Sequence, residues 1–126
     1  MPREVIQAPG VPRSHLAFSP AIRAGDFVFV SGQASVDDQG QIVRDTFEGE
    51  FRRSMENVRK VLQGAGLDLS HVVQLRAYVA RQEDLAEYNR LYRDYFQEPY
   101  PARTTLIGCL GTVLLFEVDV IAYAGS

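Results

Sequence analysis

The chain has 126 residues, of which 46% are hydrophobic and 23% charged, and its 13 basic and 16 acidic side chains give a net charge of −3. This composition excludes a disordered or fibrous chain, and the acidic balance argues against a nucleic-acid-binding protein. The length predicts one domain over residues 1–126 with a single hydrophobic core. A lone cysteine, an N-terminus unlike a signal peptide, and no apolar run near about 20 residues predict a cytoplasmic protein without a membrane span.

The first half of the chain predicts a strand, a turn and a helix. Prolines and glycines keep residues 1–25 extended or turned. The run FVFV at 27–30 predicts a buried strand, and VDDQGQ at 36–41 predicts a turn. A helix is expected from near Asp45, where Asp45 and Glu48 resemble a capping box, to the glycines at 64 and 66. Its apolar stripe, at spacings of three and four, consists of Phe47, Phe51, Met55, Val58 and Leu62.

The second half predicts a strand, a helix and a hairpin. Residues 72–80 alternate between apolar and polar side chains, as in a strand with one buried face. A helix follows over 83–96, with Leu85, Tyr88, Tyr92 and Tyr95 on its apolar stripe. Strands at 103–109 and 113–123 are separated by a short loop suited to a hairpin.

These elements predict an α+β fold with a mainly antiparallel sheet and two helices on one face. The other face of the sheet would lack cover. Apolar residues fall on both faces of several strands, so we expect an oligomer to bury the second face.

The predicted hairpin gathers charged side chains. With Cys109 opposite Val113, Arg103 faces Asp119 and Thr105 faces Glu117, all on one side of the sheet. Two interpretations follow. Arg103 forms a structural ion pair with one of the carboxylates, or it binds an anionic ligand while Glu117 serves as general acid or base.

Other chemistries find little support. The two histidines lie far apart in sequence and the chain has one cysteine, so no metal site is expected. The single lysine, Lys60, falls on the polar face of its helix, which disfavours Schiff-base chemistry. Ser31, at the end of a strand, either terminates the strand or lines a pocket.

Several segments together resemble one family. They are FSPAIRAGDFVFVSGQ at 18–33, the helix beginning FRRSMENVRK at 51, YNRLYRDYF at 88–96, PART at 101–104 and FEVDVIAY at 116–123. The chain is identified as a member of the reactive intermediate deaminase family, RidA/YjgF/UK114, also called endoribonuclease L-PSP.

The resemblance implies a chorismate-mutase-like fold and a homotrimer around an inner barrel, with three sites between subunits. It also implies hydrolysis of small carboxylate-bearing enamines and imines, such as 2-aminoacrylate, to 2-keto acids and ammonia without a cofactor.

The same resemblance assigns roles to individual residues. Arg103 matches the arginine that binds the substrate carboxylate, and Glu117 matches the glutamate that positions or activates water. Phe18 stands where many members have tyrosine, so that hydroxyl is missing here. The remaining matches to pocket positions are Thr105, Ser31, Gly32 and Asn89.

Three alternatives stay open. The protein could bind 2-keto acids without turnover, or deaminate a larger enamine such as 2-aminomuconate. Cleavage of RNA, the third, is disfavoured by the acidic balance.

Overall fold

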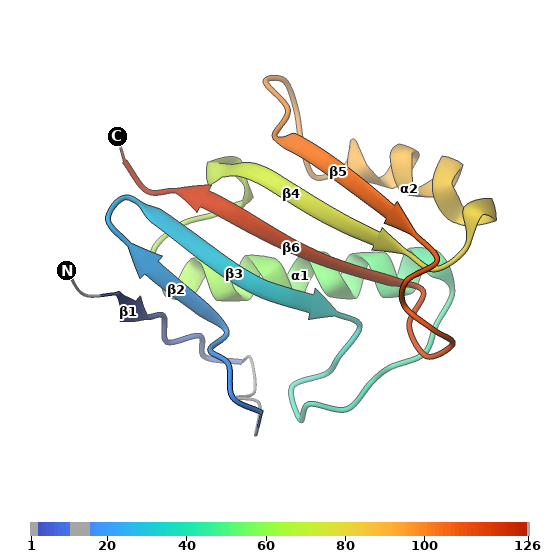
Figure 1. Cartoon of the computed structure of the whole chain (residues 1–126), viewed down its shortest axis with the longest axis horizontal. Helices are drawn as coiled ribbons and strands as arrows, with labels where there is room; N and C mark the ends of the chain where they lie inside the picture. The colour runs from blue at the N-terminus through green and yellow to red at the C-terminus, as the bar shows by residue number, and fades with distance from the viewer. Residues whose placement is uncertain (1–2, 11–15, 126) are drawn as a thin grey trace.

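The computed structural model describes residues 3–10 and 16–125, which form a mixed six-stranded sheet with helices packed against it (Figure 1). Strand β5 runs parallel to β4, and the other neighbouring strands are antiparallel. The order across the sheet is β1 (Glu4–Val5), β2 (Ala21–Ala24), β3 (Phe27–Ala34), β6 (Phe116–Tyr123), β4 (Val72–Val79) and β5 (Ala102–Ile107).

Helix α1 (Phe47–Gly64) confirms the predicted apolar stripe but not the predicted cap. The N-cap is Thr46, whose Oγ1 accepts the N–H of Gly49 at 3.1 Å. Asp45 lies one position too early for that role, and its carboxylate accepts the N–H of Thr46 at 2.7 Å instead. All five residues of the stripe are at most 3% exposed: Phe47, Phe51, Met55, Val58 and Leu62.

The second predicted helix is shorter than 83–96. A 3₁₀ turn, η2 (Gln82–Asp84), leads into α2 (Leu85–Tyr92), and backbone turns continue to Phe96. Tyr88 and Tyr92 are buried as expected, because they lie four residues apart on the face turned to the sheet. Another 3₁₀ turn, η1 (Leu69–His71), precedes β4.

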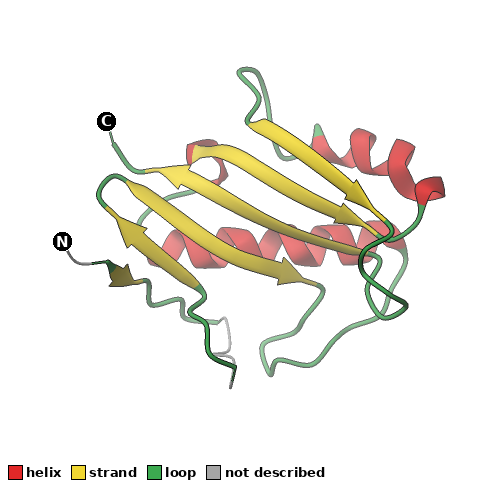
Figure 2. Ribbon diagram, viewed as in Figure 1, coloured by secondary structure: helices red, strands yellow, loops and turns green. Residues whose placement is uncertain are grey.

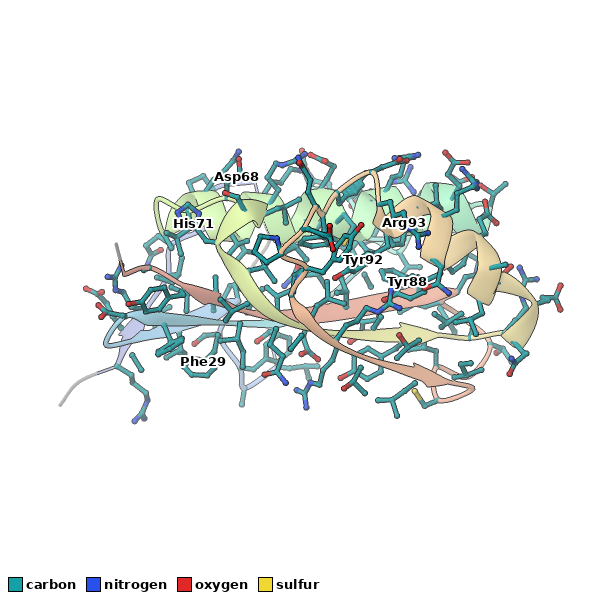
Figure 3. All side chains as sticks on the ribbon, turned by 90° about the horizontal axis from the view of Figure 1, so that it is seen from above. Phe29, Asp68, His71, Tyr88, Tyr92 and Arg93 are labelled. Atoms are coloured by element: carbon teal, nitrogen blue, oxygen red, sulfur yellow. The ribbon has the colours of Figure 1, made fainter. Side chains whose placement is uncertain are left out.

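The two α-helices cover the same face of the sheet, as predicted (Figure 2). The residues of β6 that face them are all buried: Phe116, Val118, Val120 and Ala122. On the opposite face, Phe27, Phe29 and Tyr123 are 42%, 45% and 38% exposed. Phe29 points away from the helices (Figure 3). In the described parts of the chain, no helix combines the length and the apolar character needed to cross a membrane.

The predicted hairpin of β5 and β6 is wrong, because β4 lies between them. Arg103 pairs with Leu75 of β4, and Leu75 pairs with Val120 of β6. The residue in line with Asp119 is therefore Thr104, through Arg76. This shift of one residue puts Arg103 on the other face of the sheet.

The physical reason is that β4 takes the place beside β6 that the hairpin prediction gave to β5. Helix α2 serves as the crossover that brings β5 back parallel to β4, as parallel pairing requires. Strand β6 then bonds to β3 and β4 at once and buries one whole face.

The N-terminal prediction was incomplete. Strand β2 lies within the region expected to be merely extended, and it pairs with β3 along its four residues. Residues 1–2 and 11–15 of that region lie outside the described residues.

A buried carboxylate fixes where β6 begins. Glu50 of α1 is 2% exposed, and its Oε1 accepts the N–H of Leu115 at 2.9 Å. Its Oε2 accepts the N–H of Asp45 at 3.1 Å, so the ion is satisfied on both oxygens. The segment just before Glu117 is thereby tied to the helix layer.

Candidate functional site

Arg103 lies on the helix face of the edge strand β5. Its guanidinium carbon is 4.7 Å from the ring centroid of Tyr92 and 5.1 Å from that of Tyr88. Contacts of this kind contribute about 0.5–2 kcal/mol and hold the plane of the cation. Among the described residues, no carboxylate lies within 4 Å of it, so the structural ion pair with Asp119 or Glu117 is wrong.

Asp119 has other partners. Its carboxylate accepts Nε of Arg76 at 2.9 Å and the hydroxyl of Tyr78 at 2.7 Å, on the open face of the sheet. The charge of Asp119 is therefore neutralised without Arg103.

The two tyrosines under Arg103 have unpaired hydroxyls. Both oxygens are buried and lack a hydrogen-bond partner among the described residues. Burial raises the pKa of Tyr88, and the nearby Thr105 and Arg103 offset this only in part. Burial likewise raises the pKa of Tyr92 to about 12. Both tyrosines stay neutral at physiological pH and offer Arg103 uncharged rings.

Thr105 and Asn89 lie on the same side as Arg103. Thr105 pairs in register with the buried Ala77, so its side chain also faces the helix layer. Asn89 of α2 and Arg103 border one hollow of about 210 Å³. Its described lining is Asn89, Tyr92, Arg93, Tyr100, Pro101 and Arg103. The structure thus brings three of the predicted site residues together.

Glu117 occupies the opposite face of the sheet. It pairs with Tyr78 of β4 and Ala34 of β3, and it is half-buried. A Cβ added at Gly32 would overlap its carboxylate, so the absence of a side chain at Gly32 leaves room for the carboxylate in this position. Burial raises the pKa of Glu117, and the charge of Asp119 adds to the effect. A carboxyl group held this way is suited to exchanging protons nearer neutral pH.

Ser31 joins this second group through a bulge. The register of β3 against β6 shifts between Val30 and Gln33, which displaces Ser31 and Gly32 from regular pairing. The Ser31 hydroxyl donates to the carbonyl of Ser19 at 2.6 Å. Phe18, the neighbour of Ser19, is 53% exposed, so the bond ties an exposed aromatic ring to this end of β3.

The predicted site residues therefore form two groups. The arginine group, defined as Arg103, Thr105 and Asn89, lies on the helix face. The glutamate group, defined as Glu117, Gly32 and Ser31, is centred on the open face and the bulge. The prediction that Arg103 and Glu117 share one face of a single chain is wrong, because β4 shifts the register between their strands.

Sequence reasoning missed four residues of the arginine group's surroundings. Tyr88 and Tyr92 were assigned to the helix stripe, and the stripe itself was the available signal that they face inward. Arg93 lies four residues after Asn89, so helical spacing was the available signal that the two share a face. Tyr100 had no periodic signal, because the fold of the segment after α2 brings it to the hollow. Within the described residues, no group of three or more His, Cys, Asp and Glu side chains could hold a metal ion.

Comparison with known proteins agrees with the fold. A family model described as Endoribonuclease L-PSP matches residues 9–124. A RutC family protein of Pyrococcus horikoshii is 34% identical over 96% of this chain and 98% of its own. A mouse protein named 2-iminobutanoate/2-iminopropanoate deaminase is 29% identical over 98% of this chain and 93% of its own.

A solved structure agrees over nearly the whole length. E. coli TdcF with bound serine has a TM-score of 0.85 and 27% identity, covering 97% of this chain and 99% of that one. The model match and the full-length relatives carry the assignment: this chain belongs to the endoribonuclease L-PSP family, also called the RidA/YjgF/UK114 family.

Proposed function

We propose that this protein hydrolyses small enamine and imine acids to 2-keto acids and ammonia, without a cofactor. The observation that carries the proposal is Arg103, a guanidinium stacked on two neutral rings at the edge of a hollow, with no carboxylate of its own. Such a group is prepared to bind a substrate carboxylate with paired hydrogen bonds.

The site is completed by a second copy of the chain. Arg103 and Glu117 point to opposite faces of the sheet, so one molecule cannot present both to one small substrate. The exposed aromatic residues of the open face, Phe27, Phe29 and Tyr123, favour assembly. We assign a cyclic homotrimer in which each site combines Arg103 of one subunit with Glu117 of the next.

The reaction suits these groups. An enamine acid takes a proton on its β-carbon and becomes an imine, water adds to the imine carbon, and the carbon–nitrogen bond then breaks to release ammonia. Arg103 orients the carboxylate next to the reacting carbon. Glu117 accepts a proton from the attacking water and passes it to the departing nitrogen, assistance typically worth about 10²–10⁴-fold in rate.

Two relatives support this assignment. The mouse relative carries the name of a 2-iminobutanoate/2-iminopropanoate deaminase. TdcF was solved with serine, which has the same α-carboxylate that we assign to Arg103. The family's description as an endoribonuclease finds less support here, because the net charge of −3 disfavours binding to a phosphate backbone.

A coupled assay tests the activity. A dehydratase generates 2-aminoacrylate, and pyruvate release is timed with and without this protein. We expect faster release with the wild-type protein, and at least about a hundredfold loss in Arg103→Ala and in Glu117→Gln. Light scattering shows whether each variant keeps the mass of three chains. A wild-type protein that never accelerates pyruvate release would refute the proposal.

Mixing the two inactive variants tests the shared site. After subunit exchange, each mixed trimer contains one site with both Arg103 and Glu117 intact, so about a quarter of wild-type activity should return. A mixture that exchanges subunits but stays inactive would place both groups in one chain.

A further inference from the structure

A second arginine lines the hollow beside Arg103. Arg93, at the residue after α2, lines it together with Arg103 and Asn89 (Figure 3 labels Arg93 and Tyr92). Asn89 and Arg93 are four residues apart, so their side chains lie on the same side, about 6 Å apart at Cβ. The hollow is therefore cationic at two points.

Neither arginine is neutralised within the described residues. None of the described residues lining the hollow is acidic. The acids nearest in sequence are engaged elsewhere, since Asp94 bonds Arg52 at 2.9 Å and Glu87 pairs with Arg90 at 3.6 Å. The only described hydrogen bond of Arg93 goes from Nη1 to the carbonyl of Asn89 at 3.3 Å.

The remaining walls are flat and mostly apolar. The rings of Tyr92 and Tyr100 lie 6.2 Å apart at 45°, and Pro101 continues the surface toward Arg103. A volume of about 210 Å³ is below the range of about 300–1,000 Å³ typical of drug-sized ligands, so the occupant is small. Flat walls suit the planar, conjugated skeleton of an enamine or imine acid.

The geometry points to a substrate with two anionic groups: a 2-imino or 2-enamino acid whose α-carboxylate is bound by Arg103 and whose second carboxylate is bound by Arg93. This inference rests on the proposed deamination and names its substrate class. One anionic group would pair with only one of the two guanidinium groups, whereas a dicarboxylate can pair with both.

Calorimetry with stable 2-keto acid products tests the inference on the full chain. One probe is 2-oxoglutarate, and the other is 2-oxopentanoate, which has five carbons as well but a methyl group in place of the second carboxylate. We expect the dianion to bind at least about tenfold more tightly, the difference expected for one hydrogen-bonded charge pair. Equal affinities would overturn the inference and leave the proposed deamination standing.

Two variants identify the arginine responsible. Arg93→Gln should remove the preference for 2-oxoglutarate. Arg90→Gln, which removes the same charge from the neighbouring turn of α2 but has Glu87 as its partner, should preserve it. An unchanged preference in Arg93→Gln would overturn the inference. If neither keto acid binds the wild-type protein, the inference is overturned, and the pyruvate-release assay decides the proposed deamination separately.

Discussion

Arg76 and Arg103 stand on neighbouring strands, yet their surroundings differ completely. Arg76 is in register with Thr104, the residue next to Arg103. It faces the open side of the sheet, where Asp119 of the adjacent strand accepts its Nε at 2.9 Å. Arg103 faces the helix layer, and its guanidinium lies over the rings of Tyr88 and Tyr92.

The difference separates an arginine paired within its own chain from one whose hydrogen-bond donors have no carboxylate partner among the described residues. A guanidinium with a carboxylate on the next strand is satisfied by its own chain. One stacked on neutral rings is held in orientation, but its hydrogen-bond donors stay available.

The largest effect should come from giving Arg103 a carboxylate of its own. Asn89 borders the same hollow, and Asn89→Asp changes its charge with almost no change in shape. The new carboxylate would compete with the substrate for the guanidinium, as Asp119 satisfies Arg76. We expect calorimetry to show 2-oxobutanoate binding weakened by about tenfold or more.

The pH dependence provides the control for that variant. The guanidinium should lower the pKa of the new carboxyl group, so binding should recover only as the pH falls below the ordinary pKa of aspartate, about 4. A variant that binds as well as the wild type at pH 7 would show that Asn89 does not act near the bound anion.

A smaller effect is expected from removing one ring beneath Arg103. Tyr88→Leu takes away one of the two cation–π contacts and leaves only Tyr92 to hold the guanidinium, which should weaken keto-acid binding about three- to tenfold. Tyr88→Phe keeps the ring and removes an unpaired buried hydroxyl, so it should retain affinity.

Thermal unfolding separates positioning from packing in this pair. The Phe variant should be at least as stable as the wild type, because the buried hydroxyl has no partner to lose. If Leu and Phe weaken binding equally, the ring does not position Arg103.

The sequence predicted the features that depend on residues close together in the chain better than those that depend on residues far apart. The stripe of α1 is local, so spacings of three and four identified all five buried residues correctly, from Phe47 to Leu62. The alternation of Phe116, Val118 and Val120 likewise identified the buried face of β6.

Which strands lie side by side depends on residues far apart in the chain, and the predicted pairing of β5 with β6 was wrong. Nothing in residues 103–123 alone shows that β4, some 30 residues earlier, takes the place beside β6. Side chains alternate between the two faces of a strand. Because β4 rather than β6 is the neighbour of β5, Arg103 lies on the face opposite to the predicted one. The structure places Arg103, Asn89 and Thr105 on one side of the sheet, and their separation from Glu117 follows from the sheet order.

The smallest effect concerns Glu117 in the ligand-free protein. Its pKa is raised in the folded state by burial and by Asp119, so the folded protein holds this proton to higher pH than the unfolded chain does. Stability from this group is complete below the unfolded pKa, about 4.3, and is lost as the pH rises through the folded value. Glu117→Gln removes that loss.

We therefore expect thermal unfolding to show no difference in stability between the wild type and Glu117→Gln near pH 4. At pH 7 the variant should be more stable by at most about 1 kcal/mol, because solvent screens a half-buried charge. A variant less stable than the wild type at pH 7 would instead mean that a cation, such as Arg103 of the neighbouring subunit, stabilises the ionised carboxylate in the assembly.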